Sequence, residues 1–461
     1  MQSRFYASLL LISSLILLAF VGYAGIKELN PEWKTYQQEY KRLFLNNATT
    51  PDMKKKAEAY TVGIRQIYLK DLNKVDRCDN CHTGTENPLM AKEKLPYKLH
   101  SGTYLKDHPV SRFGCTVCHL GQGNATNKKE AHGEGHETFW DYPILPMKYV
   151  QSSCKQCHDT EFLSKNGGDI VTEGEKIFNE KGCRGCHKLN GNGGSLGKPL
   201  DGVGSQPIHY FPMKYVEGER TQPEWLKQHF ADPRKIVPES AMKVNLTPEE
   251  TDKLTTYILS IRTTDAPKAF RRFNNAPIIA KDGHALYNMY CVACHTDGKL
   301  SAYDEILKGS IPAVGNPAFL KNADNKFLEM VIKEGRKGTP MTSWQLSTAG
   351  LTDEDIKNIA EYIAESRLEI SNPIANDIKA GNIEAGKEVY NIRCALCHGD
   401  KGQGGLGINL TNQIIKKADN IYLFKTIRDG RATTPMPPFE SDELGLTNQQ
   451  IADVVSYIKT L

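Results

Sequence analysis

The twelve cysteines of this chain constrain its fold more than any other feature. All of them lie in C-x-x-C pairs, and a histidine directly follows every pair. The cysteines are Cys78, Cys81, Cys115, Cys118, Cys154, Cys157, Cys183, Cys186, Cys291, Cys294, Cys394 and Cys397. The histidines that follow the pairs are His82, His119, His158, His187, His295 and His398. The fold must therefore present six thiol pairs, each beside an imidazole.

The pentapeptide C-x-x-C-H is the signature of covalent haem c attachment: two thiols add to haem vinyl groups and the histidine ligates the iron. A disulfide framework would not place a histidine after every pair, and zinc sites combine two C-x-x-C pairs or add H-x-H spacings. Residue frequencies give about 0.01 such pentapeptides by chance in a chain of this composition. We therefore predict six covalent haem c groups, with the twelve cysteines as attachment sites and the six histidines as iron ligands.

Composition and charge argue against nucleic-acid binding and suit a multidomain protein with large cofactors. The net charge is +4, from 58 basic and 54 acidic residues, and no dense basic block is present, so we expect no nucleic-acid partner. Hydrophobic residues make up only 39% of the chain, which suits a protein wrapped around large apolar cofactors. A length of 461 residues predicts several domains.

The N-terminus carries an uncharged, apolar run from Phe5 to Ile26 that is long enough to span a bilayer as a helix. The lone Arg4 before it favours an N-terminus inside the cell. A cleaved signal peptide with its cleavage site near Ala24 is the alternative. Because haem c is attached outside the cytoplasm, we expect a single-pass anchor in the bacterial cytoplasmic membrane, with the bulk of the chain on the periplasmic side.

The last three motifs belong to internal repeats. Each repeat opens with a short helical pattern that has an aromatic residue near its end, at residues 174–178, 283–287 and 386–390. Each repeat closes with an amphipathic helix that has a threonine at the N-cap and an acidic or amide residue behind it. A tyrosine late in each closing helix is expected to pack against the opening helix or the haem edge.

Between motif and closing helix, each repeat carries a loop with glycine, proline and a methionine. Over residues 170–461 this arrangement resembles the class I cytochrome c fold, in which the first and last helices cross and a loop methionine completes the iron coordination. The resemblance implies Met341 and Met436 as distal ligands, since they occupy equivalent positions before their closing helices.

The first repeat departs from this register. Met242 lies closer to its closing helix than the other two methionines do, but it still follows a proline-containing loop, and we predict it as the distal ligand. Met213 is its competitor, and the segment that contains His209 and His229 offers further alternatives.

The first three motifs are closely spaced, which predicts that their haems share one wrapping of chain. Multihaem cytochromes with closely spaced motifs typically use histidine on both sides of the iron, and this region resembles them. We predict His100, His108 and His132 as distal ligands, with His136 as the alternative to His132 and with Met90 and Met147 as remoter candidates. The spacing leaves open which histidine serves which haem.

These observations predict a mainly α-helical protein with an N-terminal transmembrane helix, an irregular trihaem module and three tandem cytochrome c-like helical domains. The predicted parts are an anchor at 1–28, the trihaem module at 29–167, and cytochrome c domains at 168–268, 269–372 and 373–461.

The ligand sets imply a direction for electron flow, because a thioether ligand raises the potential of a haem relative to a second imidazole. We expect electrons to enter at the trihaem module and to leave through the C-terminal domains. A haem enzyme with one open iron position, of peroxidase or nitrogen-oxide reductase type, and a stand-alone electron conduit are the alternatives. We expect an electron-transfer protein rather than an enzyme, since every iron has a plausible distal ligand.

Short segments beside the first two motifs resemble cytochrome subunits of bacterial quinol-oxidising complexes, namely Rieske/cytochrome b assemblies and alternative complex III. These segments are Val75-Asp76-Arg77, Arg112-Phe113-Gly114 and Gly121-Gln122-Gly123. The resemblance implies docking beside a quinol-oxidising partner, with a soluble cytochrome or an oxidase as the electron acceptor.

Overall fold

The structure is a computed structural model that describes residues 2–134, 142–263, 282–307, 309–336, 338–365, 380–431, 434–440 and 445–461. The chain forms two compact units. The first contains residues 1–171, 204–228 and 255–273, and the second contains residues 172–203, 229–254 and 274–461. The protein is mainly helical, as predicted, and the described residues contain only two short two-stranded sheets.

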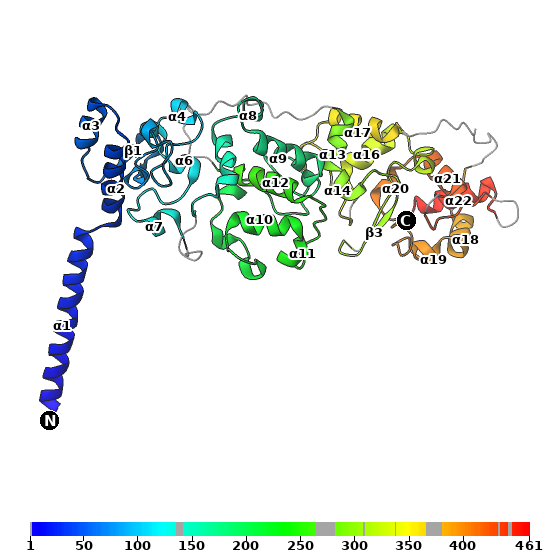
Figure 1. The fold of residues 1–461 in the computed structure, drawn as a ribbon. Helices are drawn as coiled ribbons and strands as arrows, with labels where there is room; N and C mark the ends of the chain where they lie inside the picture. The colour runs from blue at the N-terminus through cyan, green and yellow to red at the C-terminus, as the bar shows by residue number, and fades with distance from the viewer. Residues whose placement is uncertain are drawn as a thin grey trace. The chain divides into compact units, whose positions relative to one another are not determined.

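The first unit begins with α1 (Gln2–Leu29), the long blue helix of Figure 1. Its segment Arg4–Ile26 has a mean hydropathy of 2.4, and none of this segment is buried inside the protein. The predicted apolar helix is therefore confirmed, and it is long and apolar enough to cross a membrane.

The region of the first three motifs, in the same unit, is irregular, as predicted. It opens with α2 (Glu32–Asn47), α3 (Pro51–Glu58) and a hairpin of β1 (Ile67–Leu69) and β2 (Lys74–Asp76). Short helices follow, with 3₁₀ turns labelled η: η1 (Lys70–Leu72), η2 (Cys78–Asn80), η3 (Pro88–Met90), α4 (Tyr104–Asp107), α5 (Val110–Phe113), α6 (Thr116–His119), α7 (Lys128–His132), η4 (Met147–Gln156) and α8 (Thr160–Lys165). Such short elements bury little side-chain surface of their own.

The elements of the first repeat are divided between the two units. They are α9 (Asp169–Glu180), η5 (Cys183–Gly185), η6 (Val203–Ser205), η7 (Ile208–Tyr210), η8 (Met213–Tyr215), α10 (Gln222–Ala231), α11 (Pro233–Ile236) and α12 (Pro248–Ser260). Within the second unit, two ion pairs tie α9 and the residue after it to the start of α12: Lys253–Glu173 at 2.5 Å and Lys181–Glu250 at 3.0 Å.

The second repeat, in the second unit, is built around the crossing of its first and last helices. Its elements are α13 (Gly283–Tyr290), α14 (Val292–His295), β3 (Ala302–Asp304), β4 (Gly309–Ile311), α15 (Pro317–Leu320), α16 (Asn325–Glu334) and α17 (Asp353–Ala364). A side-chain carbon on Gly283 would lie only 2.1 Å from the carbonyl oxygen of Asn358, so glycine permits the close crossing of α13 and α17. The Tyr287 and Tyr362 rings pack 5.3 Å apart across this crossing.

The third repeat has the same construction. It comprises α18 (Ile383–Arg393), α19 (Ala395–His398), α20 (Gln413–Lys417), α21 (Asn420–Asp429) and α22 (Asn448–Ile458). A side-chain carbon on Gly386 would lie 2.0 Å from the carbonyl oxygen of Asp453, and the Tyr390 and Tyr457 rings are 5.2 Å apart. The predicted packing of the late tyrosine against the opening helix is confirmed in both repeats.

The closing helices of all three repeats begin with the predicted caps. Thr352 with Asp355 and Thr447 with Gln450 form capping boxes at α17 and α22. At α12, the Thr247 side chain accepts from the Glu250 N–H at 3.1 Å, and the Glu250 carboxylate accepts from the Thr247 N–H at 2.8 Å. Each box supplies acceptors for amides that the first helical turn leaves unpaired.

The second and third repeats share one hydrophobic core. Phe327 stacks on Tyr422 with ring centroids 4.0 Å apart, and ion pairs join Lys417 to Glu334 at 2.7 Å and Lys321 to Asp429 at 3.3 Å. The two repeats therefore pack directly on each other within the second unit.

Candidate haem-binding sites

All six C-x-x-C-H motifs adopt the same backbone turn. In each motif, the carbonyl oxygen of the first cysteine accepts from the N–H of the second cysteine at 3.1–3.2 Å and from the N–H of the histidine at 2.9–3.0 Å. The six motifs therefore share one backbone conformation.

The motif histidines of the three repeats have fixed ring orientations. The Nδ1 atom of His187 lies 2.8 Å from the carbonyl oxygen of Lys198, and that of His398 lies 2.8 Å from the carbonyl of Ile408. In the second repeat, Nδ1 of His295 lies 3.2 Å from the carbonyl oxygen of Pro312. A carbonyl only accepts, so Nδ1 carries the proton and donates it, which leaves Nε2 to bind a metal.

Two glycines press against these rings. Gly197 donates its N–H to the Cys186 carbonyl, and Gly407 donates to the Cys397 carbonyl, both at 2.8 Å. A side-chain carbon would lie 2.4 Å from the His187 ring at Gly197 and 2.6 Å from the His398 ring at Gly407. These glycines hold the loop close behind the motif histidine, where no other residue fits.

In the trihaem region, each motif histidine faces one of the three predicted distal histidines. The ring centroids are 6.1 Å apart for His82 and His132, 6.2 Å for His119 and His100, and 5.9 Å for His158 and His108. A metal with bonds of about 2 Å to a nitrogen of each ring would hold the two centroids about 6 Å apart. The three pairs therefore fit iron ligated by two histidines, and they favour one pairing among those that the spacing left open.

The distal histidines are oriented by hydrogen bonds at the ring nitrogen that faces away from the pair. Nδ1 of His100 lies 2.8 Å from the Ser101 carbonyl, and Nδ1 of His108 lies 3.1 Å from the Tyr104 carbonyl. Each of these contacts leaves Nε2 to bind iron.

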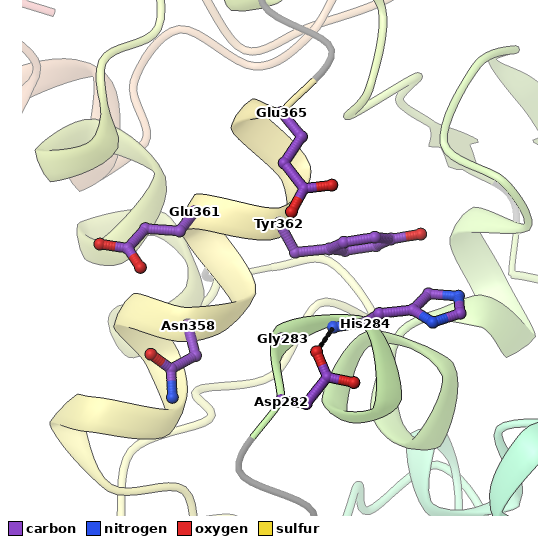
Figure 2. A pocket seen from close by; sticks show the side chains of 7 residues that line it. All are labelled: Asp282, Gly283, His284, Asn358, Glu361, Tyr362 and Glu365. Carbon is purple, nitrogen blue, oxygen red and sulfur yellow. Dashed lines mark hydrogen bonds between the residues drawn. The ribbon is translucent and has the colours of Figure 1, made fainter.

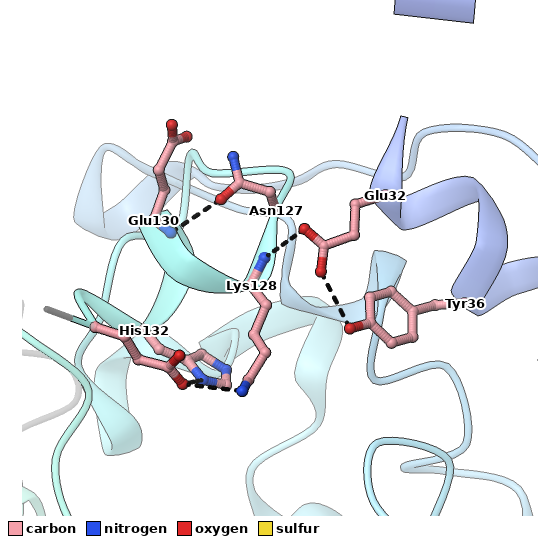
Figure 3. Close-up of polar contacts among 7 residues, drawn as sticks. Glu32, Tyr36, Asn127, Lys128, Glu130 and His132 are labelled. Atoms are coloured by element: carbon pink, nitrogen blue, oxygen red, sulfur yellow. Dashed lines mark hydrogen bonds and ion pairs between the residues drawn. The ribbon is translucent and has the colours of Figure 1, made fainter. Parts of the chain in front are cut away.

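His132 is oriented by a carboxylate instead. Its Nδ1 lies 3.3 Å from Oε1 of Glu134, which Lys128 Nζ also contacts at 3.2 Å (Figure 3). Lys128 in turn donates its backbone N–H to Glu32 of α2 at 3.3 Å. Carboxylate–histidine pairs of this kind fix the tautomer and strengthen the imidazole as a ligand.

The pKa values of the motif histidines suit metal binding. Burial, with a further effect of the neighbouring His132 and His119 rings, lowers the pKa of His82, and burial together with His100 lowers the pKa of His119. Both imidazoles are therefore neutral at neutral pH, which is the form that ligates a metal.

Asp76 supports the first two motifs together. Its carboxylate is fully buried and accepts from the Cys78 N–H at 3.0 Å, the Cys115 N–H at 2.8 Å and the Thr116 N–H at 2.9 Å. Burial alone would raise the pKa of Asp76, but these backbone hydrogen bonds lower it, so the group stays ionised. Asp76, Cys78 and Cys115 also satisfy the spacing of a small metal site. Because the two thiols belong to haem motifs, we interpret Asp76 as a structural anion.

The fourth site contains two candidate distal ligands, both in the second unit. His229, on α10, interacts electrostatically with His187; burial first, and then this neighbour, lower the pKa of His229 to about 4. Met242 follows α11, is partly buried, and donates its N–H to Ser240 Oγ at 3.2 Å. Met213 lies in η8 and the exposed His209 in η7, both in the first unit. The sequence indicated His229 only as an alternative, since nothing in its spacing marked it.

The loops of Met341 and Met436 have the same conformation. The Arg336 N–H donates to the Met341 carbonyl at 2.7 Å, and the Arg431 N–H donates to the Met436 carbonyl at 3.0 Å. Both methionines are partly buried against the shared core. The two loops thus share this hydrogen bond, and iron ligation by their thioethers stays a prediction.

The remaining candidates from the sequence have other surroundings. Met90 is fully buried in the core of the first unit, whereas Met147 is largely exposed. His136, the alternative to His132, lies outside the described residues.

A pocket of about 230 Å³ lies between the start of α13 and the last turns of α17 (Figure 2). It is lined by Asp282, Gly283, His284, Asn358, Glu361, Tyr362 and Glu365. None of these residues belongs to a C-x-x-C-H motif, so we assign no haem to this pocket.

Family models match the three repeats. Residues 171–262 match the model described as cytochrome c. Residues 279–363 and 381–458 match the model of cytochrome c oxidase, cbb3-type, subunit III. A cytochrome c-553-like protein of Synechocystis is 30% identical over 81 residues, which cover 18% of this chain and 70% of that protein. The chain belongs to the cytochrome c family. With several such domains, it is a multihaem c-type cytochrome that transfers electrons through covalently bound haem.

Two oxidase subunits are also similar to this cytochrome. The cbb3-type cytochrome c oxidase subunit CcoP of Azospirillum sp. (strain B510) is 28% identical over 170 residues, which cover 32% of this chain and 52% of the subunit. The CcoP of Azospirillum brasilense is 26% identical over 195 residues, or 38% of this chain and 61% of the subunit. The cytochrome thus spans only about half to three fifths of the length of these relatives.

One solved structure was also found, a chain of the reducing HAO-like protein complex of Kuenenia stuttgartiensis. It is 16% identical, has a TM-score of 0.29, and matches 40% of this cytochrome and 96% of that chain. The likeness is too low to carry an argument about function.

Proposed function

We propose that this cytochrome carries six covalent haem c groups and conducts electrons as a membrane-anchored subunit of a respiratory complex. The proposal of six haems is supported by the backbone turn that all six motifs share. In this turn, the carbonyl of the first cysteine accepts from the N–H groups of the second cysteine and of the histidine. When bound, each haem supplies a one-electron redox centre whose potential the axial ligands tune.

The protein provides two kinds of ligand sets under this proposal. The trihaem module offers the pairs His82–His132, His119–His100 and His158–His108. The second and third repeats offer Met341 and Met436 on matching loops, with His295 and His398 as the proximal ligands. A thioether ligand raises the potential relative to a second imidazole, so the C-terminal sites lie at higher potential and electrons flow toward them.

Two features support the proposal that the cytochrome is a subunit of a membrane complex: helix α1 and the second and third repeats. The apolar helix α1 provides the anchor, and the trihaem module would lie on the periplasmic side beside a quinol-oxidising partner of Rieske/cytochrome b or alternative complex III type. The second and third repeats match an oxidase subunit model, which supports an oxidase, or a soluble cytochrome that serves one, as the acceptor.

Replacing both cysteines of one motif at a time by alanine tests the haem number. Each of the six variants is expected to lose the mass of one haem and to keep the other five. A variant whose haem content does not change would show that its motif is not an attachment site.

Carbon monoxide binding tests the enzyme alternative. An electron-transfer protein with six ligands on every iron is expected to bind carbon monoxide poorly after reduction. Stoichiometric binding at one site would indicate an open iron and favour an enzyme.

Isolation from gently solubilised membranes tests the complex. We expect subunits with quinol-binding or oxidase sequences to travel with the cytochrome. Purification of the cytochrome alone under conditions that keep other respiratory complexes intact would favour the stand-alone conduit.

A further inference from the structure

The haem-attachment segments of the first and second repeats lie back to back in the second unit. Two glycines make this approach possible. A side-chain carbon on Gly182 would lie 2.9 Å from the Ala293 amide nitrogen, and one on Gly185 would lie 2.7 Å from the Tyr290 carbonyl oxygen. The backbone of the fourth motif therefore rests directly on the backbone of the fifth.

Polar contacts on both sides hold the two segments together. Beyond the fourth motif, Lys188 Nζ donates to the Thr348 carbonyl at 2.9 Å, and the Gly193 N–H donates to the Ala349 carbonyl at 2.9 Å.

On the other side, Lys243 forms an ion pair with Asp304 at 2.7 Å. The Asp304 side chain is almost fully buried, and its second carboxylate oxygen accepts from the N–H groups of Ile306 and Leu307 at 3.0 Å each. The Asp304 carboxylate is thus held by two backbone N–H groups while it pairs with Lys243, which adds a further contact between the first and second repeats.

The second cysteines of the two motifs directly follow residues of this contact. A side-chain carbon on Gly185 would lie 3.4 Å from the Ala293 side chain. Cys186 follows Gly185 and Cys294 follows Ala293, so each is an attachment sulfur of a different haem under the proposed function. The contact therefore lies directly beside two proposed attachment points.

The third repeat shows that this contact is not a general property of the motif. Gly185 and Ala293 occupy the position before the second cysteine in the fourth and fifth motifs. In the sixth motif the same position holds Leu396, whose side chain is 90% exposed. Among the three repeats, the small residues therefore occur in the two motifs that contact each other, and the large residue occurs in the motif where this position is exposed.

We propose that the Gly182–Cys186 and Tyr290–Cys294 segments form a junction that holds the fourth and fifth haem sites as one magnetically and electronically coupled pair. The proposal rests on the proposed function, because it requires haem at both motifs. In a transfer between the two sites, the fourth site gives up the electron that the fifth takes up, or the reverse. No bond forms or breaks in this step, and it needs no further oxidant.

The test introduces at the junction the side chain that the third repeat carries. In the full-length oxidised protein, Gly185→Leu is expected to separate the two segments, and Gly185→Ala to separate them by a smaller amount. Leu396→Gly is the matched control, because it changes the same motif position where the side chain is exposed. Intact mass gives the haem count of every variant, and electron paramagnetic resonance and Soret circular dichroism report haem–haem coupling.

We expect Gly185→Leu to keep six haems, to lose one exciton component of the dichroism spectrum, and to gain the signal of uncoupled ferric haem. Gly185→Ala should show a partial loss and Leu396→Gly none. If Gly185→Leu loses a haem, its spectra do not test the coupling, and the spectra of Gly185→Ala test it instead. Spectra of a six-haem Gly185 variant that match the unmodified protein would overturn the junction and leave the proposed function intact. Absence of haem from the fourth or fifth motif in the unmodified protein would instead overturn the proposed function.

Discussion

Removing the Asp76 carboxylate is expected to loosen the first two haem motifs together. Asp76→Ala leaves three partly buried N–H groups, those of Cys78, Cys115 and Thr116, without their acceptor. A fully buried donor without a partner costs about 1 to 3 kcal/mol, so the upper limit for three is about 3 to 9 kcal/mol. Water can enter the space that the side chain leaves, so we take about 4 kcal/mol as the working value.

Asp76→Asn separates geometry from charge. The amide oxygen can replace the carboxylate oxygen that accepts from Cys115 and Thr116, but the amide NH₂ then faces the Cys78 N–H and cannot accept from it. One of three hydrogen bonds is lost, which predicts a cost of about 1.5 kcal/mol.

Hydrogen exchange measured by mass spectrometry is the suitable assay, because a multidomain protein does not unfold in a single two-state step. A cost of 4 kcal/mol lowers the protection of the amides in both motifs about 10³-fold, and 1.5 kcal/mol lowers it about tenfold. Asp71→Ala is the control, since Asp71 is exposed and a surface change of this kind costs at most about 0.5 kcal/mol. The reasoning is refuted if Asp76→Ala loosens only the first motif, or if it leaves both as protected as the control does.

Three further predictions concern the ligands. Replacing His108 by alanine should vacate one iron position of the third haem only, and replacing His100 should do so at the second haem only. Carbon monoxide binding to each reduced variant should then rise from none to one equivalent. Binding at two sites would contradict the pairing. At the fourth site, if Met242 is the ligand, the protein has three near-infrared bands of methionine-ligated ferric haem and Met242→Leu abolishes one of them. If His229 ligates instead, three such bands cannot occur, and His229→Leu opens the iron site. Gly407→Ala should displace the ring of His398, because the new carbon would lie 2.6 Å from that ring. The reduction potential of the sixth haem alone should shift. Gly309→Ala is the control: its nearest neighbour lies at 3.6 Å, and no haem potential should change.

The repeats were predictable because their signals are local. The capping boxes at Thr247, Thr352 and Thr447 lie within four consecutive residues each, and the backbone turn of every motif lies within its own pentapeptide. The match of Met341 and Met436 is a prediction of the same kind, and their loops share one backbone hydrogen bond at the methionine.

The pairing of the distal histidines was not predictable, because it depends on contacts between distant segments. His132 faces the first motif although the second motif lies between them in the chain, and His108 faces the third motif across the second. Hydrophobic periodicity cannot guide such a prediction where the helices are only four or five residues long. Asp76 escaped notice as a support for the same reason: a single aspartate carries no local sign that two motifs will converge on it.

This crossed pairing explains why the trihaem module differs in kind from the repeats. Each repeat brings its motif histidine and its candidate loop methionine from one stretch of chain. In the module, the segment that ends in His132 has to return to the first motif, and the carboxylate of Asp76 has to reach the second. Asp76 therefore couples the order of the first two motifs, and under the proposed function the histidine pairs would couple all three sites.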